Sequence, residues 1–540
     1  MNVQETNIKW SSPNEVFATN EELDILQSWR AIDDALGKTA EKQFGFSSST
    51  RISFRARVIR RIKFEFQKIS TSVLKTMGYV WRLVFRKYGH RVWSDLDEFE
   101  TNGVHFKVFS LDKSIEEIIG LVNNSNADYF VLTRTTNSFL KTNTETISDE
   151  IRAFSPDVIY GDVLLANRTV YKNFPFSRLL FRQVDFFGPV IIVSRNSIQV
   201  CINQPDLSPT LWPVFLGLNI EPAQISYLEQ PFGVGESIQN YPEILASELV
   251  NLVNSEISLS KLNAEVVFTS VGRLEIKYSP RTSPLVSIII PTRGSGHGDF
   301  TFVANAVDSI LKKSTYRDFE LCIIADANTP QFVITQIDEM CSQFEVPIRW
   351  IRWSEPFHFS KTMNIGSVVS AGELLLFLND DIEVVAKDWI DRMVSLLQID
   401  NVKHIGALLF FEDQTIQHAG HFYKGGAGHI GFGEYLRLNS PQEVYSLDRT
   451  VSGVTAACSL IPRETFDQIG GFTEIFPGNY NDVDLSLKIE LSGYSSAISS
   501  HSRLYHFESK TRDATVSVEE ILKLNNRWGK RLTHDPWWNN

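Results

Sequence analysis

Two adjacent carboxylates, Asp380 and Asp381, follow an apolar run and an asparagine in LLLFLNDDIEVV, residues 374–385. Like charges this close repel, and each is costly to bury unless something compensates it. A bound cation is the usual compensation, and Mg²⁺ and Mn²⁺ prefer oxygen ligands such as carboxylates. A surface turn after a strand is the alternative, because Asn-Asp pairs are common there. The pair is therefore a candidate metal site.

Two further apolar runs end in polar residues in the same part of the chain. LVSIIIPT leads to Thr292 and Arg293, and FELCIIAD ends at Asp326, with a helical pattern between the two runs. Fully apolar strands that alternate with helices are typical of a parallel sheet covered on both faces. Ligands of such sheets bind beyond the carboxyl ends of the strands. We therefore expect these side chains to meet the carboxylate pair in one crevice.

Two later residues have types that suit catalysis. His506 follows apolar residues in LYHFESKTR, a context that by itself favours a core histidine. Asp482 lies in GNYNDVDLSLKIELSGY, at the predicted start of a helix, where the N-terminus favours negative charge. An Asp at a helix start is also an ordinary cap. Asp484 is a second choice in the same motif, better suited to a supporting role.

The composition bounds the class of protein. The chain has 540 residues, 43% of them hydrophobic, which predicts two to four globular domains. A net charge of −12 argues against a general nucleic-acid binder. Four widely spaced cysteines favour reduced thiols in a cytoplasmic protein. The polar N-terminus lacks the pattern of a signal peptide, and no apolar run approaches the roughly 18–20 residues that span a bilayer. We expect a soluble or peripheral protein.

One segment departs from this acidic average. Residues 51–91 contain 12 Lys and Arg against one acidic residue, interleaved with large apolar residues. This pattern predicts a cationic amphipathic helix that could lie on an anionic membrane surface. The alternative is a helix whose apolar face packs on its own protein. An earlier helix is expected around residues 20–36.

Predicted strands and helices also alternate in the region between these helices and the strands described above. Short strand-like runs separated by helical or polar stretches occur in residues 100–200 and suggest an α/β unit. A helix is expected in residues 240–265, then a hairpin in 264–280, and PRTSP (280–284) has the composition of a linker.

Seven motifs in order give residues 284–540 a family resemblance. They are PLVSIIIPTRG, LLLFLNDDIEV, TIQHAGHFY, VSGVTAACSLIPRETFDQIGGF, NYNDVDLSLKIELSGY, LYHFESKTR and RWGKRLTHDPWWN. Together they resemble the family 2 nucleotide-sugar glycosyltransferases of GT-A fold, with the closest likeness to bacterial rhamnosyltransferase-like enzymes of O-antigen or capsule synthesis. The resemblance implies an inverting enzyme with a divalent metal, Mn²⁺ or Mg²⁺. Its donor would be a nucleotide diphosphate sugar, and its acceptor a growing or lipid-linked glycan at the cytoplasmic membrane face.

The resemblance also assigns roles to residues. Asp482 would be the general base, and the metal ligands would be Asp381, Asp380 and His506. The donor nucleotide and its diphosphate would be contacted by Pro291, Thr292, Arg293, Asp326, Lys361, Asn364, Asp380, Lys510 and Arg512. The segment 451–458 would line the cleft between sugar and acceptor. The glycine-rich stretch 418–433 is expected to be a mobile loop, and a phosphate-binding P-loop is excluded because no GK[ST] follows it.

The expected fold class is α/β, with a catalytic GT-A domain in residues 284–540 whose sheet is Rossmann-like and mostly parallel. Residues 92–250 resemble a degenerate GT-A-like domain, because the strand ADYFVLTRTTN carries Thr133, Arg134 and Thr135 where acids are expected. Residues 251–283 would connect the two domains, and residues 1–91 would form an N-terminal helical region with the basic segment 51–91. The alternative function is a non-catalytic protein of glycan binding or polysaccharide assembly. A metal-dependent phosphohydrolase would need more His and Asp ligands than the expected crevice supplies.

Overall fold

The computed structural model describes residues 14–16, 18–44, 92–93, 98–134, 139–140, 144–165, 168–236, 239–270, 272–298, 300–399, 401–436, 441–507 and 516–538. The chain forms two compact units. The large unit comprises residues 1–47 and 278–536, and the small unit comprises residues 48–277 and 537–540. The basic segment 51–91 lies outside the described residues. None of the helices in the described part of the chain is long and apolar enough to cross a membrane.

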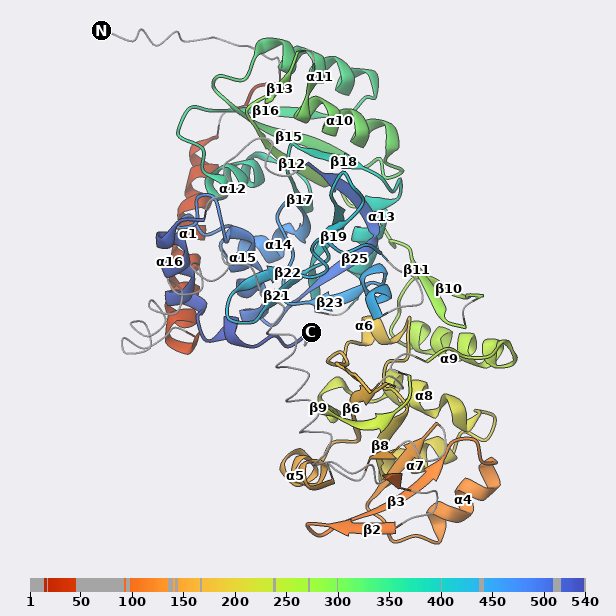
Figure 1. Cartoon of the computed structure of the whole chain (residues 1–540). Coiled ribbons are helices and arrows are strands. Elements are labelled where there is room, and N and C mark those ends of the chain that lie inside the picture. The colour runs from red at the N-terminus through yellow and green to blue at the C-terminus, as the bar shows by residue number, and fades with distance from the viewer. Residues whose placement is uncertain are drawn as a thin grey trace, which may run out of the picture. The chain divides into compact units, whose positions relative to one another are not determined.

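The large unit is built on a ten-stranded sheet with the order β16-β15-β12-β17-β24-β19-β25-β18, on which β20 pairs with β19 and β23 with β25 (Figure 1). Strands β16, β15, β12 and β17 are parallel, whereas β24 is antiparallel to both its neighbours. The strands are β12 (Val286–Thr292), β15 (Phe319–Asp326), β16 (Ile348–Trp353), β17 (Leu374–Leu378), β18 (Ile382–Val384), β19 (Val402–Phe410), β20 (Ile416–His418), β23 (Arg449–Val451), β24 (Cys458–Pro462) and β25 (Ser495–His506).

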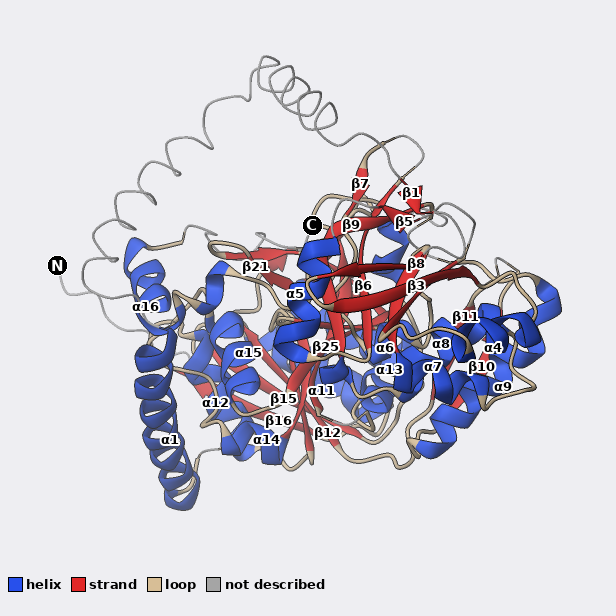
Figure 2. Ribbon diagram, turned by 90° about the horizontal axis from the view of Figure 1, so that it is seen from below, coloured by secondary structure: helices blue, strands red, loops and turns tan. Residues whose placement is uncertain are grey.

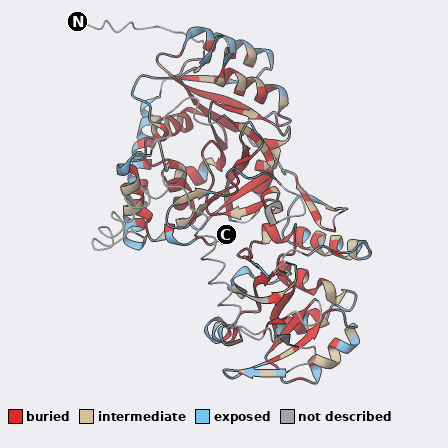
Figure 3. Ribbon diagram, in the orientation of Figure 1, coloured by how far each residue is buried: buried red, intermediate tan, exposed pale blue. Residues whose placement is uncertain are grey.

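Burial follows the sequence pattern in the centre of this sheet. Every residue of β12 and β17 is buried, and the central strands of both units are coloured as buried in Figure 3. The expected α/β class is confirmed, but the sheet is mixed rather than mostly parallel, because only β16, β15, β12 and β17 form a continuous parallel run. Strand β16 was not expected, because Arg349 and Arg352 interrupt the apolar residues of IRWIRW, and it lies at one end of the strand order.

Helices cover both faces of the sheet (Figure 2). Helices α12, α14 and α15 share one hydrophobic cluster with the N-terminal helix α1. The helices of this unit are α1 (Asn20–Phe44), α10 (Phe302–Lys313), α11 (Gln331–Gln343), α12 (Phe359–Val369), α13 (Trp389–Leu396), α14 (Arg463–Gln468), α15 (Asn481–Leu491) and α16 (Val518–Trp528).

Helix α1 is part of the large unit although it precedes the small unit in sequence. Trp29 packs edge-on against Phe466 at 5.2 Å between ring centroids, and α1 lies beside α16 (Figure 1). The helix expected in residues 20–36 therefore exists and continues to Phe44. The expected N-terminal region 1–91 is divided, because its first helix belongs to the same compact unit as residues 278–536.

The small unit has a nine-stranded sheet with the order β1-β5-β9-β6-β8-β4-β3-β2, on which β7 pairs with β6. Its strands are β1 (Val92–Trp93), β2 (Glu98–Thr101), β3 (Val104–Ser110), β4 (Tyr129–Thr133), β5 (Phe139–Leu140), β6 (Val158–Leu164), β7 (Val170–Tyr171), β8 (Val190–Ser194) and β9 (Ile225–Val234). Its helices of four residues or more are α4 (Ile115–Asn123), α5 (Thr144–Phe154), α6 (Arg178–Phe181), α7 (Arg195–Ile202), α8 (Trp212–Asn219) and α9 (Ala246–Leu259). The expected hairpin is β10 (Ala264–Phe268) with β11 (Leu274–Tyr278).

Three smaller features complete the chain. Short antiparallel hairpins are formed by β13 (Gly296–His297) with β14 (Phe300–Thr301), and by β21 (His421–Tyr423) with β22 (Ala427–His429). The glycine-rich stretch 418–433 that was expected to be a mobile loop therefore contains β21 and β22 and begins at the last residue of β20. All four cysteines are buried and free, as expected of reduced thiols.

Candidate active site

A cavity of about 340 Å³ lies beyond the carboxyl ends of β12 and β17 in the large unit. Its walls come from strand ends, from the start of α15 and from the β21–β22 hairpin. Seven of the residues expected to act in the site line it, namely Pro291, Thr292, Arg293, Asp380, Asp381, Asp482 and His506. The position agrees with the general rule for ligand sites in parallel α/β sheets.

The parallel register of two strands brings Thr292 to Asp380. Ile289 of β12 lies opposite Phe377 of β17, so the residues three positions further along each strand also face one another. The Thr292 hydroxyl donates a hydrogen bond of 2.6 Å to Asp380 Oδ2. The pairing of β12 with β17 thus brings Thr292, at the end of the first expected strand, to the carboxylate pair.

The carboxylate pair is buried, which argues against the alternative of an exposed surface turn. Asp380 is 9% exposed and Asp381 is 4% exposed. Burial raises the pKa of Asp380 to about 7, against the lowering effect of the Thr292 hydrogen bond, and the neighbouring charge of Asp381 raises it further. The ionised form of a buried carboxylate is stabilised by any cation that binds beside it.

A second pairing places His506 beside Asp381. Strand β18 begins directly after the carboxylates and runs antiparallel to β25, with Ile382 opposite His506. The His506 Nε2 atom lies 3.1 Å from Asp381 Oδ1, and both side chains are buried. The histidine is therefore a member of the site rather than part of the apolar core.

Hydrogen bonds fix the tautomer of His506. Its Nδ1 lies 2.6 Å from Gln417 Oε1, an acceptor, so Nδ1 carries the proton. The side-chain amide of Asn379 lies 3.0 Å from Nε2. Nε2 therefore faces Asp381, and Gln417 has the position of a group that orients a metal-binding histidine.

This donor set fits a hard or borderline divalent cation. Asp381 and His506 present an oxygen and a ring nitrogen at neighbouring positions, and Asp380 adds a second carboxylate in the same buried wall. Oxygen ligands with one imidazole suit Mn²⁺ or Mg²⁺ better than a soft metal.

Asp482 lies in the wall formed by α15. It is the second residue of this helix, follows Tyr480 in a left-handed conformation (φ 61°), and its side chain is 19% exposed. His421 Nε2 lies 3.8 Å from Asp482 Oδ2. The carboxylate therefore faces the cavity and not the protein interior, as a base that contacts a substrate must.

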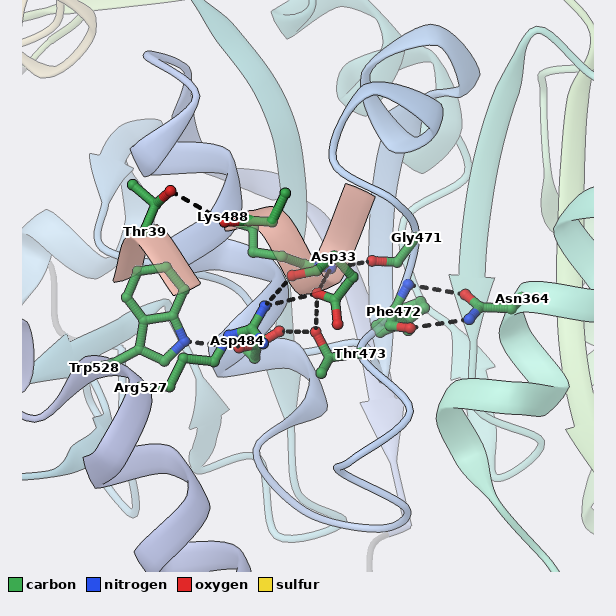
Figure 4. A network of polar contacts seen from close by, with 11 residues as sticks. Asp33, Thr39, Asn364, Gly471, Phe472, Thr473, Asp484, Lys488, Arg527 and Trp528 are labelled. Atoms are coloured by element: carbon green, nitrogen blue, oxygen red, sulfur yellow. Dashed lines mark hydrogen bonds and ion pairs between the residues drawn. The ribbon is translucent and has the colours of Figure 1, made fainter. Parts of the chain in front are cut away.

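Asp484, two residues later, has a different position. Its side chain is fully buried, where Trp528 Nε1 donates to it at 2.7 Å and Arg527 Nε lies 2.9 Å away. Figure 4 shows this carboxylate in a polar network beneath the helix, together with Asp33 of α1. Asp484 therefore anchors α15, which is the supporting role expected for it.

Three candidates for nucleotide contacts, all of them described, do not line the cavity. Asn364 is buried, and its amide donates to and accepts from the backbone of Phe472 at 2.9 and 2.8 Å (Figure 4). Lys361 Nζ lies 3.3 Å from Glu355 Oε2, and Asp326 Oδ1 accepts hydrogen bonds from Asn328. Asn364 thus holds the Phe472 backbone, and its nucleotide contact stays a prediction. Lys510 and Arg512 lie outside the described residues.

Several residues of the cavity wall were not singled out in the sequence. They include Asn379, Phe357, Gln417, His421, His429 and Tyr480. The guanidinium of Arg293 stacks over the Phe357 ring at 5.2 Å from its centroid. The motif TIQHAGHFY could have indicated Gln417 and His421, because both are polar residues in a strand-like sequence, and such residues are costly to bury without a partner.

Comparison with known proteins gives a family match in the same region. Residues 287–470 match the family model described as Glycosyl transferase family 2, which confirms the resemblance expected from the motifs for that part of the chain. Over 269 residues the chain is 34% identical to "Uncharacterized protein y4gI" of Sinorhizobium fredii (strain NBRC 101917 / NGR234), covering 48% of this chain and 29% of that protein. Over 295 residues it is 30% identical to "O-antigen biosynthesis protein RfbC" of Myxococcus xanthus, covering 53% and 22% respectively. The chain thus spans less than a third of the length of these relatives.

Two solved structures are similar at low identity. One is the crystal structure of GalNAc-T7 with UDP, GalNAc and Mn²⁺, with 17% identity, a TM-score of 0.36, and coverage of 44% of this chain and 47% of that chain. The other is the mannosyltransferase PcManGT from Pyrobaculum calidifontis in complex with GDP-Man and Mn²⁺, with 13% identity, a TM-score of 0.32, and coverage of 47% and 71%. These scores are too low to bear on activity or ligands.

Proposed function

We propose, from the match of residues 287–470 to glycosyl transferase family 2, that the large unit moves a sugar from a nucleotide diphosphate sugar to a hydroxyl group. One observation carries the proposal: a buried carboxylate–imidazole set suited to a divalent metal shares one cavity with a separate carboxylate, Asp482, at the start of a helix. Sugar transfer needs both groups, one at the leaving diphosphate and one at the acceptor hydroxyl.

The chain's own residues divide the chemistry between them. Asp380, Asp381 and His506 would hold the metal, which would supply positive charge to neutralise the leaving diphosphate. Asp482 accepts the proton of the acceptor hydroxyl, whose oxygen forms the new bond to the anomeric carbon. The bond between that carbon and the phosphate oxygen breaks, and the diphosphate leaves with the electron pair.

A single in-line displacement of this kind inverts the anomeric centre. It needs a base on the acceptor side and no covalent nucleophile on the donor. The assignment of Asp482 as the base is supported by its exposure to the cavity and by the burial of Asp484 in structural contacts. We therefore propose an inverting enzyme that uses Mn²⁺ or Mg²⁺.

Binding of the donor is the first test. Thermal stabilisation of the protein by UDP-, GDP- and dTDP-sugars is measured with MnCl₂ and with EDTA, because a ligand of the native state raises the melting temperature. We expect stabilisation with Mn²⁺ that is lost in EDTA and in Asp381→Ala. The matched control is Asp318→Ala, an exposed carboxylate at the opposite end of β15. Stabilisation that is undiminished by EDTA would contradict the metal assignment.

Transfer is the second test. Asp482→Asn should keep Mn²⁺-dependent donor binding and reduce kcat by about 10²- to 10⁴-fold, the usual contribution of a general base. An active Asp482→Asn enzyme would remove the base assignment. Donor binding by the wild type without transfer to any acceptor would favour the alternative of a non-catalytic glycan-binding or assembly protein.

The acceptor and its location extend the proposal. The partial likeness to an O-antigen biosynthesis protein supports a growing surface glycan as the acceptor, lipid-linked and at the cytoplasmic face of the membrane. The 12 basic residues of the segment 51–91 would attract it to anionic lipid, at roughly 1 kcal/mol per basic residue near the surface. Flotation with anionic liposomes should weaken when 51–91 is deleted or salt is raised. Flotation that is unaffected by both changes would remove the membrane proposal.

The pairing pattern of its sheet supports the small unit as a degenerate relative of the large one. In the small unit β3 is parallel to β4, β8 is antiparallel to β4 and β6, and β6 is parallel to β9. In the large unit β12, β17, β24, β19 and β25 pair with the same directions in the same order. In the small unit the short strand β5 follows β4 and pairs antiparallel with β9. In the large unit the short strand β18 follows β17 and pairs antiparallel with β25.

The position that corresponds to the carboxylate pair has changed in the small unit. The chain between β4 and β5 reads RTTNS and contains no acid. Its Arg134 donates to the Gly188 carbonyl at 2.9 Å and forms an ion pair with Asp185. A buried guanidinium here is incompatible with a bound cation. We therefore propose that the small unit holds no metal–diphosphate and has a structural or acceptor-binding role.

A further inference from the structure

Three histidines form a cluster in the wall of the cavity next to Asp482. His418 ends β20, and His421 and His429 are directly opposite in the β21–β22 hairpin, so their side chains share one face. The ring centroids are 4.8–5.0 Å apart, with the rings nearly perpendicular. His421 and His429 line the cavity, whereas His418 is fully buried behind them.

The hairpin that carries these rings is fixed by the surrounding chain. The His421 N–H donates to the Gly453 carbonyl at 2.7 Å, and the Tyr423 N–H donates to Asp535 at 2.6 Å. At the turn, the Gly425 N–H donates to the Leu532 carbonyl at 2.7 Å. The rings are therefore held in place before any ligand binds, as a binding site requires.

Hydrogen bonds determine which nitrogen of two rings carries the proton. The Thr455 N–H donates to His418 Nε2 at 3.1 Å, so that nitrogen is unprotonated and the neutral ring carries its proton on Nδ1. His418 Nδ1 lies 3.0 Å from His429 Nδ1 and donates to it. The proton of neutral His429 is therefore on Nε2, which makes this nitrogen a donor.

The same bonds argue against a metal ion at the cluster. A metal on His418 Nδ1 would force the proton onto Nε2, where it would oppose the Thr455 N–H. His418 is completely buried, and burial together with the neighbouring histidines holds its pKa well below the usual range. The ring is thus a neutral spacer that holds His429 in one orientation.

His421 is neutral as well, and its proton is directed at Asp482. Burial lowers the pKa of His421 to about 4 in spite of the nearby Asp482 carboxylate. Its Nδ1 is buried and, within the described part of the chain, has no hydrogen-bond partner. A proton is better placed on Nε2, because the Asp482 carboxylate lies 3.8 Å away. This separation is too long for a direct hydrogen bond, but one hydroxyl oxygen can lie within reach of both groups.

We propose that His421 and His429 form the acceptor subsite, in which neutral imidazole N–H groups bind the hydroxyls of an uncharged saccharide. The inference rests on the proposed function. The reacting hydroxyl accepts a hydrogen bond from His421 Nε2 and donates its own proton to Asp482. A second hydroxyl of the same sugar accepts from His429 Nε2. His418 contacts no substrate and is a positioning residue for His429.

The experiment compares His429→Ala and His429→Gln with the wild type, because His429 is exposed and His429→Gln can still accept a hydrogen bond from the buried His418 Nδ1. Methyl glycosides of glucose, galactose, mannose, rhamnose and N-acetylglucosamine serve as acceptor probes. Loss of one hydrogen bond predicts an increase of about fivefold to tenfold in acceptor KM for His429→Ala. His429→Gln, which keeps an N–H donor, should recover most of this loss. The change in acceptor KM should exceed any change in donor KM.

Three results would overturn the proposal, and they are distinguishable. Unchanged acceptor KM in His429→Ala, with transfer intact, removes the acceptor subsite alone. Tight binding of Zn²⁺ to the wild type that is lost in His429→Ala, but kept in Asp381→Ala, makes the cluster a metal centre. Failure of the wild type to bind any nucleotide diphosphate with Mn²⁺ removes the proposed function together with the subsite. A tautomer readout by ¹⁵N spectroscopy of labelled histidine adds a test independent of any acceptor, because a proton on His418 Nε2 contradicts the arrangement.

Discussion

A buried network joins the N-terminal helix to the helix of the candidate base (Figure 4). Asp33 of α1 accepts from Lys488 Nζ of α15 at 2.9 Å and from Arg527 Nη2 of α16 at 2.6 Å. The Thr473 hydroxyl lies between Asp33 and Asp484. Since Lys488 is fully buried, the Asp33 carboxylate compensates a charge that water cannot reach. The first helix of the chain should therefore stabilise the fold that positions Asp482.

Asp33→Asn tests this interaction at nearly constant shape. The substitution removes the negative charge beside the buried Lys488 ammonium, although the asparagine amide oxygen can still accept a hydrogen bond, and the Gly471 carbonyl at 2.5 Å stays in place. Breaking a buried ion pair from one side typically costs about 3–5 kcal/mol. For a unit of this size that corresponds to a decrease of about 5–8 °C in melting temperature. It is also a large share of a total stability of about 5–15 kcal/mol.

Urea unfolding and thermal melts near neutral pH measure the effect. The control is Asp34→Asn, the same substitution at the next residue of α1, where the side chain is exposed and a change within about 0.5 kcal/mol is expected. The double variant Asp33→Asn with Lys488→Met removes the stranded ammonium, and we expect it to be more stable than the sum of the single effects predicts.

The pH dependence has a definite sign. Although burial raises the pKa of Asp33, Lys488 and Arg527 lower it further, so that its folded value is below the usual one. The stability it contributes is present above the unfolded pKa and is lost as pH falls through the folded pKa. An Asp33→Asn protein that melts within a degree or two of the wild type near neutral pH would refute the argument.

Two further predictions concern other buried charges. The folded pKa of Asp380, about 7, is above its unfolded value, so wild-type stability in EDTA should fall as pH rises from about 4 to about 7. Between about pH 5 and pH 8, the free energy of unfolding of Asp380→Asn should rise by about 2–3 kcal/mol relative to that of the wild type. Equal urea midpoints for the two proteins at both pH values would contradict this. In the small unit, Arg182 and Glu256 form a buried ion pair with two hydrogen bonds of 2.7 and 2.6 Å. Arg182→Met should lower the free energy of unfolding in urea by about 3 kcal/mol or more, because it leaves the Glu256 charge buried and unpaired. The double variant with Glu256→Leu should recover most of this loss. No recovery in the double variant would show that the loss is one of packing rather than of stranded charge.

The sequence alone determined the features that depend on short-range pattern. Runs of apolar residues with polar ends located β12, β15 and β17, because a buried strand needs an unbroken apolar sequence. The same pattern predicted that Thr292 and Asp380 would lie in one crevice, and the register of β12 with β17 brings them into contact. An amphipathic pattern likewise located α1, although not the unit to which it belongs.

Tertiary structure alone decided which polar residues share a partner. Asn364 and Asp326 had the types and positions of ligand contacts, but one is bound to the Phe472 backbone and the other to a turn. No local pattern indicates that His506 would face Asp381, or that Asp33 would reach Lys488 some 455 positions away. Such contacts depend on strand register and helix packing between distant segments. Residue types thus predicted the chemistry of the site, and the fold determined which of these side chains line the cavity.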